Sequence, residues 1–397
     1  MPDAPLASRH HNRIAALHAE VTAWRRDLHA HPEIGFEERR TAAFVAAKLR
    51  EFGVDEVIEG IGRTGVVGLI RGRAPGPAIG LRADMDALPM TERTGLPHAS
   101  TAPGRMHACG HDGHTAMLLG AAKLLAEERD FAGTVAVVFQ PAEEGGGGGR
   151  EMVEDGLIAR TGIESVWGLH NWPDLPLGTF ASLAGPVMAG IDYFDVAIRG
   201  QGTHSGMPHE GADTVLAACH LVTTLQSVPA RSLPPTETAT LGISMIKGSD
   251  AYVVMTEEAT LGGSLRWFSE AARDRAEARL RRLAESVAAG FECEAVIDWR
   301  RNYPPCLNPA KEAGFAAETA AELVGAANVV TEHPPCMAGE DFSFMLAERP
   351  GAYVWMGTGS PDHRSGKLHY PDYDFNDAAI PHGVAYWLAL VDRLLPA

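Results

Sequence analysis

The sequence lacks any apolar run long enough to cross a membrane. A spanning helix needs about 20 consecutive apolar residues, and no run comes near that length. The N-terminal segment, residues 1–20, also lacks the apolar core of a secretory signal peptide. We therefore expect no membrane partner and no secretion.

Cysteine is scarce and shows no pairing pattern. The chain has five cysteines, an odd number, and no Cys-x-x-Cys motif. Secreted domains held by disulfides usually carry an even number at framework spacings. The usage favours a reducing compartment, and we expect a cytoplasmic protein.

Positive charge is in short supply. The chain has 34 Lys and Arg residues and 51 Asp and Glu residues, which gives a formal net charge of -17. Nucleic acids and anionic membrane surfaces bind to basic faces of proteins. The balance therefore predicts neither a nucleic-acid partner nor an anionic-membrane partner.

Short apolar runs with strand composition recur along the chain, at residues 78–82, 134–139, 165–169 and 352–356. They are nearly continuous rather than alternating, as is typical of strands buried on both faces of a helix-covered sheet. Helical stretches such as residues 114–129 lie between them. Because strand and helix alternate, we predict an α/β layered fold.

A second pattern interrupts the first. At 397 residues the chain is too long for one core. The pattern predicts the order βαββαβ, typical of a split-βαβ, ferredoxin-like sandwich, at residues 191–199, 211–228, 238–247, 259–268, 270–290 and 292–299. Turn-rich segments bracket it at 184–186 and 303–305. We predict an inserted domain at 190–302 between the two parts, 1–189 and 303–397, of the first.

Polar clusters follow the predicted strands of the α/β domain, at residues 84–86, 106–114, 141–144 and 170–172. Sites in such sheets form beyond the carboxyl ends of strands. The cluster His-Ala-Cys-Gly-His-Asp-Gly-His holds imidazoles, a thiol and a carboxylate at residues 107–114. These donors suit Zn²⁺ or a neighbouring divalent ion, so a metal site is predicted.

Other chemistries fit less well. The pentaglycine Gly145–Gly149 lacks the Gly-Lys-Ser/Thr of a phosphate loop, and we interpret it as a flexible turn. No Gly-x-Ser-x-Gly motif supports a serine hydrolase. Cys109 could also act as a nucleophile. Its thiol lies two residues from His111 in the sequence, however, and this spacing favours a role as a metal ligand.

The pair Glu143 and Glu144 suggests a division of labour. Metal-assisted hydrolysis uses one carboxylate on the metal and another to take a proton from water. Consecutive residues on an extended segment point to opposite sides, so we expect the two side chains to do different jobs.

At these motifs the sequence resembles the M20 metallopeptidase family. Within it, the amidohydrolases that include hippurate hydrolase, aminoacylase-like enzymes and plant auxin-conjugate hydrolases are most similar. The matching motifs run nearly end to end, at residues 26–33, 81–89, 106–114, 139–145, 168–170, 339–342 and 368–371. The resemblance implies a zinc-peptidase-like α/β catalytic domain whose inserted domain serves as a lid and for dimerisation.

The resemblance also implies a two-metal site with Glu143 as the general base. Zn²⁺ or Mn²⁺ is expected, and Co²⁺ or Ni²⁺ is compatible. The wider family has His-x-Asp where this chain has Asp84-Met85-Asp86; Cys109 then compensates, and Asp86 orients a ligand from outside the metal shell. The implied ligands are Cys109, His111, Glu144, His170 and His369.

The inserted domain carries the implied substrate contacts. His204, in Gly-Thr-His-Ser-Gly, matches a residue that reaches the neighbouring subunit's site and helps to bind the oxyanion, which implies a homodimer. Arg266 matches a position suited to pairing with a substrate carboxylate. This chain has Tyr252 and Met255 where the subgroup has Asn and Pro, and the change affects the expected substrate specificity.

The expected reaction is hydrolysis of an N-acyl amino acid, of the hippurate or N-acetyl type, to a carboxylic acid and a free amino acid. Three alternatives remain. One is a dipeptidase or carboxypeptidase on the same scaffold. Another is a non-catalytic metal-dependent binding protein, although the base and all the implied ligand positions are filled. The third is a cysteine hydrolase that uses Cys109 and His111.

Overall fold

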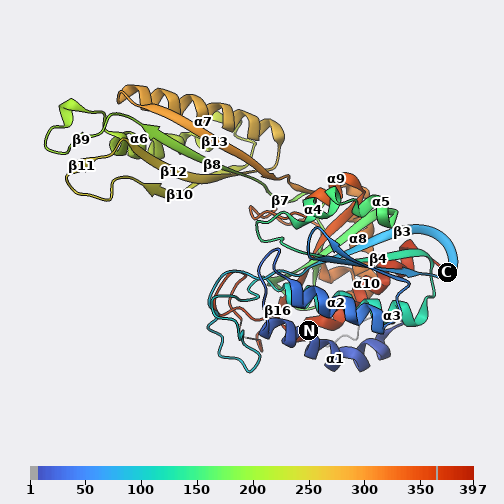
Figure 1. Cartoon of the computed structure of the whole chain (residues 1–397). Helices are drawn as coiled ribbons and strands as arrows, with labels where there is room; N and C mark the ends of the chain where they lie inside the picture. The colour runs from blue at the N-terminus through green and yellow to red at the C-terminus, as the bar shows by residue number, and fades with distance from the viewer. Residues whose placement is uncertain (1–7, 364) are drawn as a thin grey trace. The chain divides into compact units, whose positions relative to one another are not determined.

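The chain folds into two compact units (Figure 1). The computed structural model describes residues 8–363 and 365–397, so the start of the N-terminal segment considered above, residues 1–7, lies outside the described residues. Unit 1 comprises Met1–Val187, Leu307–Pro334 and Asp341–Ala397. Unit 2 comprises Met188–Cys306 and a short segment from later in the chain, Pro335–Glu340. The sequence did not indicate that this second segment belongs to unit 2.

Unit 1 is built on a mixed sheet in the order β1-β2-β4-β3-β5-β16-β6-β15. Neighbours β4, β3, β5 and β16 run parallel, whereas β1 and β2 continue the sheet antiparallel at one edge. The four apolar runs predicted as strands all lie in strands of this sheet, namely β3, β4, β5 and β16, which confirms the α/β fold. The bounds are β1 (Glu56–Ile61), β2 (Gly65–Arg71), β3 (Ala74–Asp84), β4 (Ala132–Gln140), β5 (Ile163–Pro176), β6 (Phe180–Ala181), β15 (Val329–Val330) and β16 (Gly351–Gly359).

Helices cover this sheet on both faces (Figure 1). Helix α3 packs on β3 and is covered by α1 and α10, and α4 packs against α5 and α9. Because α3 is enclosed, it is apolar nearly all round. The bounds are α1 (His11–Ala30), α2 (Arg39–Glu51), α3 (His111–Glu128), α4 (Gly148–Glu154), α5 (Leu157–Thr161), α8 (Ala310–Val324), α9 (Ser343–Glu348) and α10 (Ile380–Leu394), with short 3-10 turns η3 (Ala326–Asn328) and η4 (Asp377–Ala379).

Gly110 determines where α3 begins. Its φ of 94° lies in the left-handed region that favours glycine. A Cβ at this position would also collide with the side chain of Asn171. Only glycine therefore lets the chain turn there and place His111 in the first turn of α3.

Unit 2 has an antiparallel sheet in the order β10-β12-β8-β13, with α6 and α7 packed on it. Its main elements are β8 (Gly190–Arg199), α6 (Thr214–Leu225), β10 (Ala239–Lys247), β12 (Glu258–Trp267), α7 (Glu270–Gly290) and β13 (Glu294–Tyr303). The smaller ones are β9 (Thr203–His204), η1 (Pro208–Glu210), η2 (Val228–Ser232) and β11 (Val254–Met255). Two short strands that pair with each other, β7 (Gly185–Met188) and β14 (Cys306–Asn308), contain the residues where the chain passes from one unit to the other.

Capping explains the helix bounds in unit 2. Helix α6 begins three residues later than the predicted start at 211, because the side chain of Asp213 accepts a hydrogen bond from the Leu216 amide at 2.9 Å. Ser269 caps α7 in the same way through the Ala272 amide at 3.1 Å. The buried face of α7 repeats every four residues and is mostly alanine, so the helix lies close to the sheet.

None of the helices within residues 8–363 and 365–397 combines the length and the hydropathy of a membrane span.

Candidate metal centre

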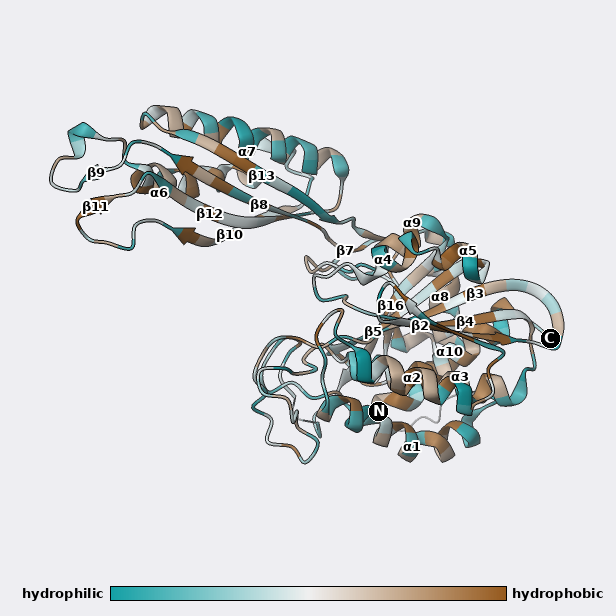
Figure 2. Cartoon of the chain, in the orientation of Figure 1, coloured by the Kyte–Doolittle hydropathy of each residue, from teal (hydrophilic) through white to brown (hydrophobic). Residues whose placement is uncertain are grey.

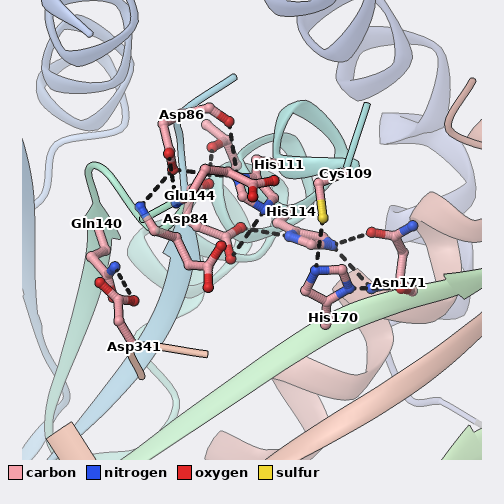
Figure 3. A network of polar contacts seen from close by, with 12 residues as sticks. Asp84, Asp86, Cys109, His111, His114, Gln140, Glu144, His170, Asn171 and Asp341 are labelled. Carbon is pink, nitrogen blue, oxygen red and sulfur yellow. Dashed lines mark hydrogen bonds and ion pairs between the residues drawn. The ribbon is translucent and has the colours of Figure 1, made fainter. Parts of the chain in front are cut away.

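The candidate metal centre belongs to unit 1 and lies at the carboxyl ends of β3, β4 and β5 (Figure 3). Asp84 ends β3, Glu144 follows β4, and His170 lies within β5. Because these strands are parallel neighbours, their carboxyl ends share one edge of the sheet. The first turn of α3 brings His111 to the same edge.

The structure brings the implied ligands together. Donor atoms of Cys109, Glu144 and His369 lie within 4.8 Å of one another. The same limit encloses His111 with Glu143 and Glu144. A third group within 4.8 Å holds Asp84, His111, His114 and His170. Glu144 and His111 thus link the groups into one continuous cluster.

Two imidazoles in this cluster present the correct nitrogen to a metal. Nδ1 of His111 lies 2.9 Å from the Asp86 carbonyl oxygen, and Nδ1 of His170 lies 2.7 Å from the Asn171 carbonyl oxygen. A carbonyl only accepts, so each Nδ1 carries a hydrogen and each Nε2 is the nitrogen left to bind a metal. Metal-binding histidines are usually oriented in this way. The Nε2 atom of His111 is buried and makes no hydrogen bond within the described part of the chain.

His114 and Asp84 differ from the implied ligands because both nitrogens of His114 and both oxygens of Asp84 are bonded to groups outside the implied ligand set. Nε2 of His170, by contrast, faces another implied ligand, Cys109 Sγ, at 3.4 Å. Nδ1 of His114 lies 2.6 Å from Asp84 Oδ1, and its Nε2 lies 2.6 Å from Asn171 Oδ1 (Figure 3). The second oxygen of Asp84 accepts from Arg82 at 2.7 Å. We interpret this pair as support behind the metal shell, because binding a metal would break these bonds.

The electrostatics of the cluster favour a cation. Burial lowers the pKa of His111, but the carboxylates of Asp84 and Asp86 outweigh it and raise that pKa to about 10. Burial and the nearby carboxylates of Glu144 and Glu143 raise the pKa of the Cys109 thiol well above its usual value. Without a cation nearby the Cys109 thiol is therefore a poor nucleophile, whereas a bound metal ion would offset the carboxylates and stabilise the thiolate.

The glutamate pair lies on a turn rather than on the extended segment that we expected. The preceding Ala142 has a left-handed φ of 51°. The amides of Glu143 and Glu144 donate to the two carboxylate oxygens of Asp86, both at 2.9 Å. The side chain of Glu144 meets His369, with Nε2 and Oε1 3.1 Å apart. The turn, not strand alternation, therefore gives the two glutamates different surroundings.

The implied substrate contacts all lie in unit 2. His204, in β9, is exposed, and its Nδ1 accepts from the Gly206 amide at 3.0 Å. Arg266, in β12, is partly buried and donates to the Met337 carbonyl at 2.9 Å. Tyr252 is fully exposed, between β10 and β11. Their contributions to the site stay predictions.

Sequence reasoning missed a buried network behind the centre. Arg82 donates to Gln140 at 2.9 Å and to Asp341 at 3.2 Å, and Asp341 accepts from the Gly149 amide at 2.8 Å. The signal was an arginine inside an apolar strand and the Gly-Glu-Asp-Phe motif at 339–342. The pentaglycine is therefore a turn that runs into α4 and is attached to the network at its end.

Comparison with known proteins agrees with this geometry. The family model described as Peptidase family M20/M25/M40 matches residues 80–393. The chain belongs to this family. It is 38% identical to the N-acetylcysteine deacetylase of Bacillus subtilis over 94% of this chain and 97% of that protein. It is 37% identical to the hippurate hydrolase of Campylobacter jejuni over 96% of this chain and 98% of that protein.

A solved structure extends the likeness to the whole fold. The crystal structure of the Bacillus subtilis YXEP protein, described as a dinuclear metal binding peptidase from the M20 family, matches with a TM-score of 0.82. The two are 35% identical, and the match covers 96% of this chain and 99% of that one. The family predicted from the sequence motifs is confirmed.

Proposed function

We propose that this M20 chain hydrolyses the amide bond of N-acyl amino acids with the help of two divalent metal ions. The observation that carries the proposal is the cluster in unit 1 where a thiol, imidazole nitrogens and two glutamates converge. Relatives named as N-acetylcysteine deacetylase and hippurate hydrolase support the substrate class. The description of the YXEP protein as dinuclear supports the metal count.

The residues that would hold the metals are Cys109, His111, Glu144, His170 and His369. Their sulfur, nitrogen and oxygen donors suit Zn²⁺, and Mn²⁺, Co²⁺ or Ni²⁺ is compatible. When bound, divalent ions polarise a carbonyl and make water a better nucleophile at neutral pH. The buried carboxylates around His111 favour the bound cations.

Glu143 is the general base in this proposal. Glu143 is only 7% exposed, and its backbone amide donates to the Asp86 carboxylate at 2.9 Å. The carboxylate takes a proton from water as the water oxygen attacks the amide carbon. When the carbon–nitrogen bond breaks, the same carboxyl returns that proton to the leaving amine. The products are a carboxylic acid and a free amino acid.

A network of buried hydrogen bonds behind the implied ligands holds them in position. Asn171 donates from Nδ2 to the Tyr373 hydroxyl at 2.7 Å, while its Oδ1 meets His114 at 2.6 Å. Asp84 connects His114 to Arg82. These buried bonds join β3, α3 and β5. Pre-organisation of this kind removes the need to reorder ligands during reaction.

Unit 2 would supply the contacts to the acyl group and the carboxylate. Because Nδ1 of His204 accepts a hydrogen bond, its Nε2 carries the hydrogen and is able to donate to an oxyanion. In a homodimer that donor would come from His204 of the partner subunit. Arg266 would pair with the substrate carboxylate. Tyr252, which replaces the subgroup's substrate-contacting Asn, would bind the substrate and affect substrate choice.

The surface of unit 2 supports a homodimer. Strand β10 is an edge strand of its sheet, and part of it is hydrophobic (Figure 2). Its Met245 and Ile246 are 62% and 55% accessible. On α6, Val215 and Leu216 are 38% and 46% accessible. Exposed edge strands with apolar side chains are sites where a second chain adds. A second copy would extend the sheet at β10 and cover these residues.

A reducing compartment suits the proposed chemistry, and we infer a cytoplasmic location from it. All five cysteines are free thiols. Cys109 needs to stay reduced to bind a metal.

The test is a substrate panel on metal-stripped and metal-restored protein. N-acetyl, N-benzoyl and N-indoleacetyl amino acids are compared with dipeptides, each with Zn²⁺, Mn²⁺, Co²⁺ or Ni²⁺ restored. We expect hydrolysis of N-acyl amino acids that a chelator abolishes and a metal restores. Turnover of dipeptides alone would favour a peptidase. No turnover with any metal would favour a binding protein, and activity that survives chelation but not thiol alkylation would favour a cysteine hydrolase.

A further inference from the structure

We propose that Glu38, far from the metal ligands in sequence, is a positioning residue that holds the turn carrying the general base. The inference rests on the proposed function of Glu143.

Three consecutive backbone amides of the turn all donate to buried carboxylates. The Ala142 amide donates to Glu38 Oε1 at 2.8 Å. The next two amides, of Glu143 and Glu144, donate to the two oxygens of Asp86 at 2.9 Å each. Both oxygens of Asp86 are thereby occupied, and Glu38 is the carboxylate that holds the residue before the base.

Ala142 needs such a partner because its backbone is strained. Its φ of 51° lies in the left-handed region, which a residue with a Cβ adopts only when its surroundings impose it. Two glycines enclose it, since a Cβ at Gly35 would lie 3.0 Å and one at Gly146 2.7 Å from the Ala142 Cβ. The bond from Glu38 and this close packing together maintain the turn.

Glu38 is fully buried, at the residue before α2 begins. Its second oxygen accepts from the Thr64 hydroxyl at 2.6 Å. Burial, with a further contribution from Asp86, raises the pKa of Glu38 to about 7. A buried carboxyl beside another carboxylate is costly for stability. Its placement is therefore better explained by the turn that it holds.

The metal ligand depends on Glu38 less than the base does. Glu144 is held by Asp86 through its amide and by His369 through its side chain. Glu143 is also held by Asp86 through its amide, but it directly follows Ala142, so a shift of Ala142 reaches it first. Loss of the Glu38 carboxylate should therefore displace the base while the metal stays bound.

The test compares Glu38→Ala, Glu38→Gln and a matched control, Glu33→Ala. The Glu33 carboxylate accepts hydrogen bonds from the Arg40 and Thr41 amides in the first turn of α2, at 3.0 and 2.8 Å. These bonds do not involve the turn at Ala142. For Glu38→Ala we expect kcat on an N-acyl amino acid to fall about 10- to 100-fold, with KM within about threefold of the parent. Metal content should stay at the parent's level. Glu38→Gln keeps an acceptor for the Ala142 amide and should restore kcat to within about threefold of the parent.

Hydrogen–deuterium exchange of the peptide spanning residues 139–150 supplies a readout that needs no activity. Exchange there should be about tenfold faster in Glu38→Ala than in the parent, and unchanged in Glu38→Gln and Glu33→Ala. If neither the parent nor any variant hydrolyses an amide, the proposed function fails. The hydrogen–deuterium exchange at residues 139–150 still decides whether Glu38 positions the turn.

Parent-like exchange and kcat in Glu38→Ala would overturn the proposal, as would an equal loss of kcat in Glu33→Ala. If Glu38→Ala does not fold, Glu38→Asp takes its place. This change keeps the charge but withdraws the carboxylate from Ala142 by one methylene. Slower turnover with faster exchange at 139–150 supports the role, and parent-like values of both overturn it.

Discussion

Replacing Asp86 by asparagine should damage the metal centre although Asp86 is not among the ligands. Its two oxygens accept from the Glu143 and Glu144 amides at 2.9 Å, and its backbone carbonyl orients His111. Asparagine keeps one acceptor oxygen but sets its own NH₂ group against the other amide. One charge-assisted hydrogen bond is then lost, and a buried N–H is left facing a donor.

The expected cost follows from those bonds. Losing one charge-assisted hydrogen bond and burying an unpaired donor lowers the free energy of unfolding by about 2–3 kcal/mol. Displacing the amides of both glutamates should weaken metal binding about 10- to 100-fold. It should also lower kcat at saturating metal about 100-fold. Urea unfolding, metal analysis after dialysis and steady-state kinetics measure the three quantities.

Asp155→Asn provides the matched control. The Asp155 side chain also accepts from a backbone amide, that of Gly62, at 2.8 Å, but it is exposed and outside the centre. We expect it to lower the free energy of unfolding by at most about 1 kcal/mol and to leave kcat and metal content unchanged. The reasoning would be refuted if Asp86→Asn retained full metal and kcat within about threefold of the parent.

Three further changes test other parts of the account. Burial lowers the pKa of His29, but Asp112, 2.8 Å away, outweighs it and raises that pKa to about 9 from 6.5. The stabilisation from charged His29 is therefore complete below pH 6.5 and is lost as the pH rises through about 9. Urea unfolding of the parent and His29→Gln should differ less at high pH, and a constant difference would contradict this. Met245→Glu with Ile246→Glu should give monomers by light scattering; a persistent dimer would place the interface elsewhere. Cys109→Ala should lower bound metal on dialysis by about half or more, whereas full occupancy would remove Cys109 from the shell.

The strands at the centre of the sheet were predictable because both of their faces are buried. Continuous apolar runs at 134–139 and 352–356 match β4 and β16. The edge strand β1 was missed, since its Glu56 and Glu59 face solvent and give no apolar run. Pro335–Glu340 joins unit 2 only through contacts distant in sequence, which no local pattern indicates.

The candidate site was predictable as a set of residue types but not as a set of available atoms. His111 and His114 lie one turn apart in the same motif, yet Nε2 of His111 is without a hydrogen bond among the described residues and Nε2 of His114 is bonded to Asn171. That difference depends on carbonyls and side chains from other strands. Likewise, Glu38 reaches the turn at Ala142 across more than 100 residues of sequence. No spacing rule in the sequence signals such a contact.

The central claim is that Glu143 is the base of a metal-dependent amide hydrolysis. Its most direct test is Glu143→Gln, which keeps the shape and the backbone bond to Asp86 but removes the proton acceptor. We predict that turnover of the best N-acyl amino acid falls by about 10²–10⁴-fold, with the metal content of the parent. Parent-like turnover at full metal content would contradict the account.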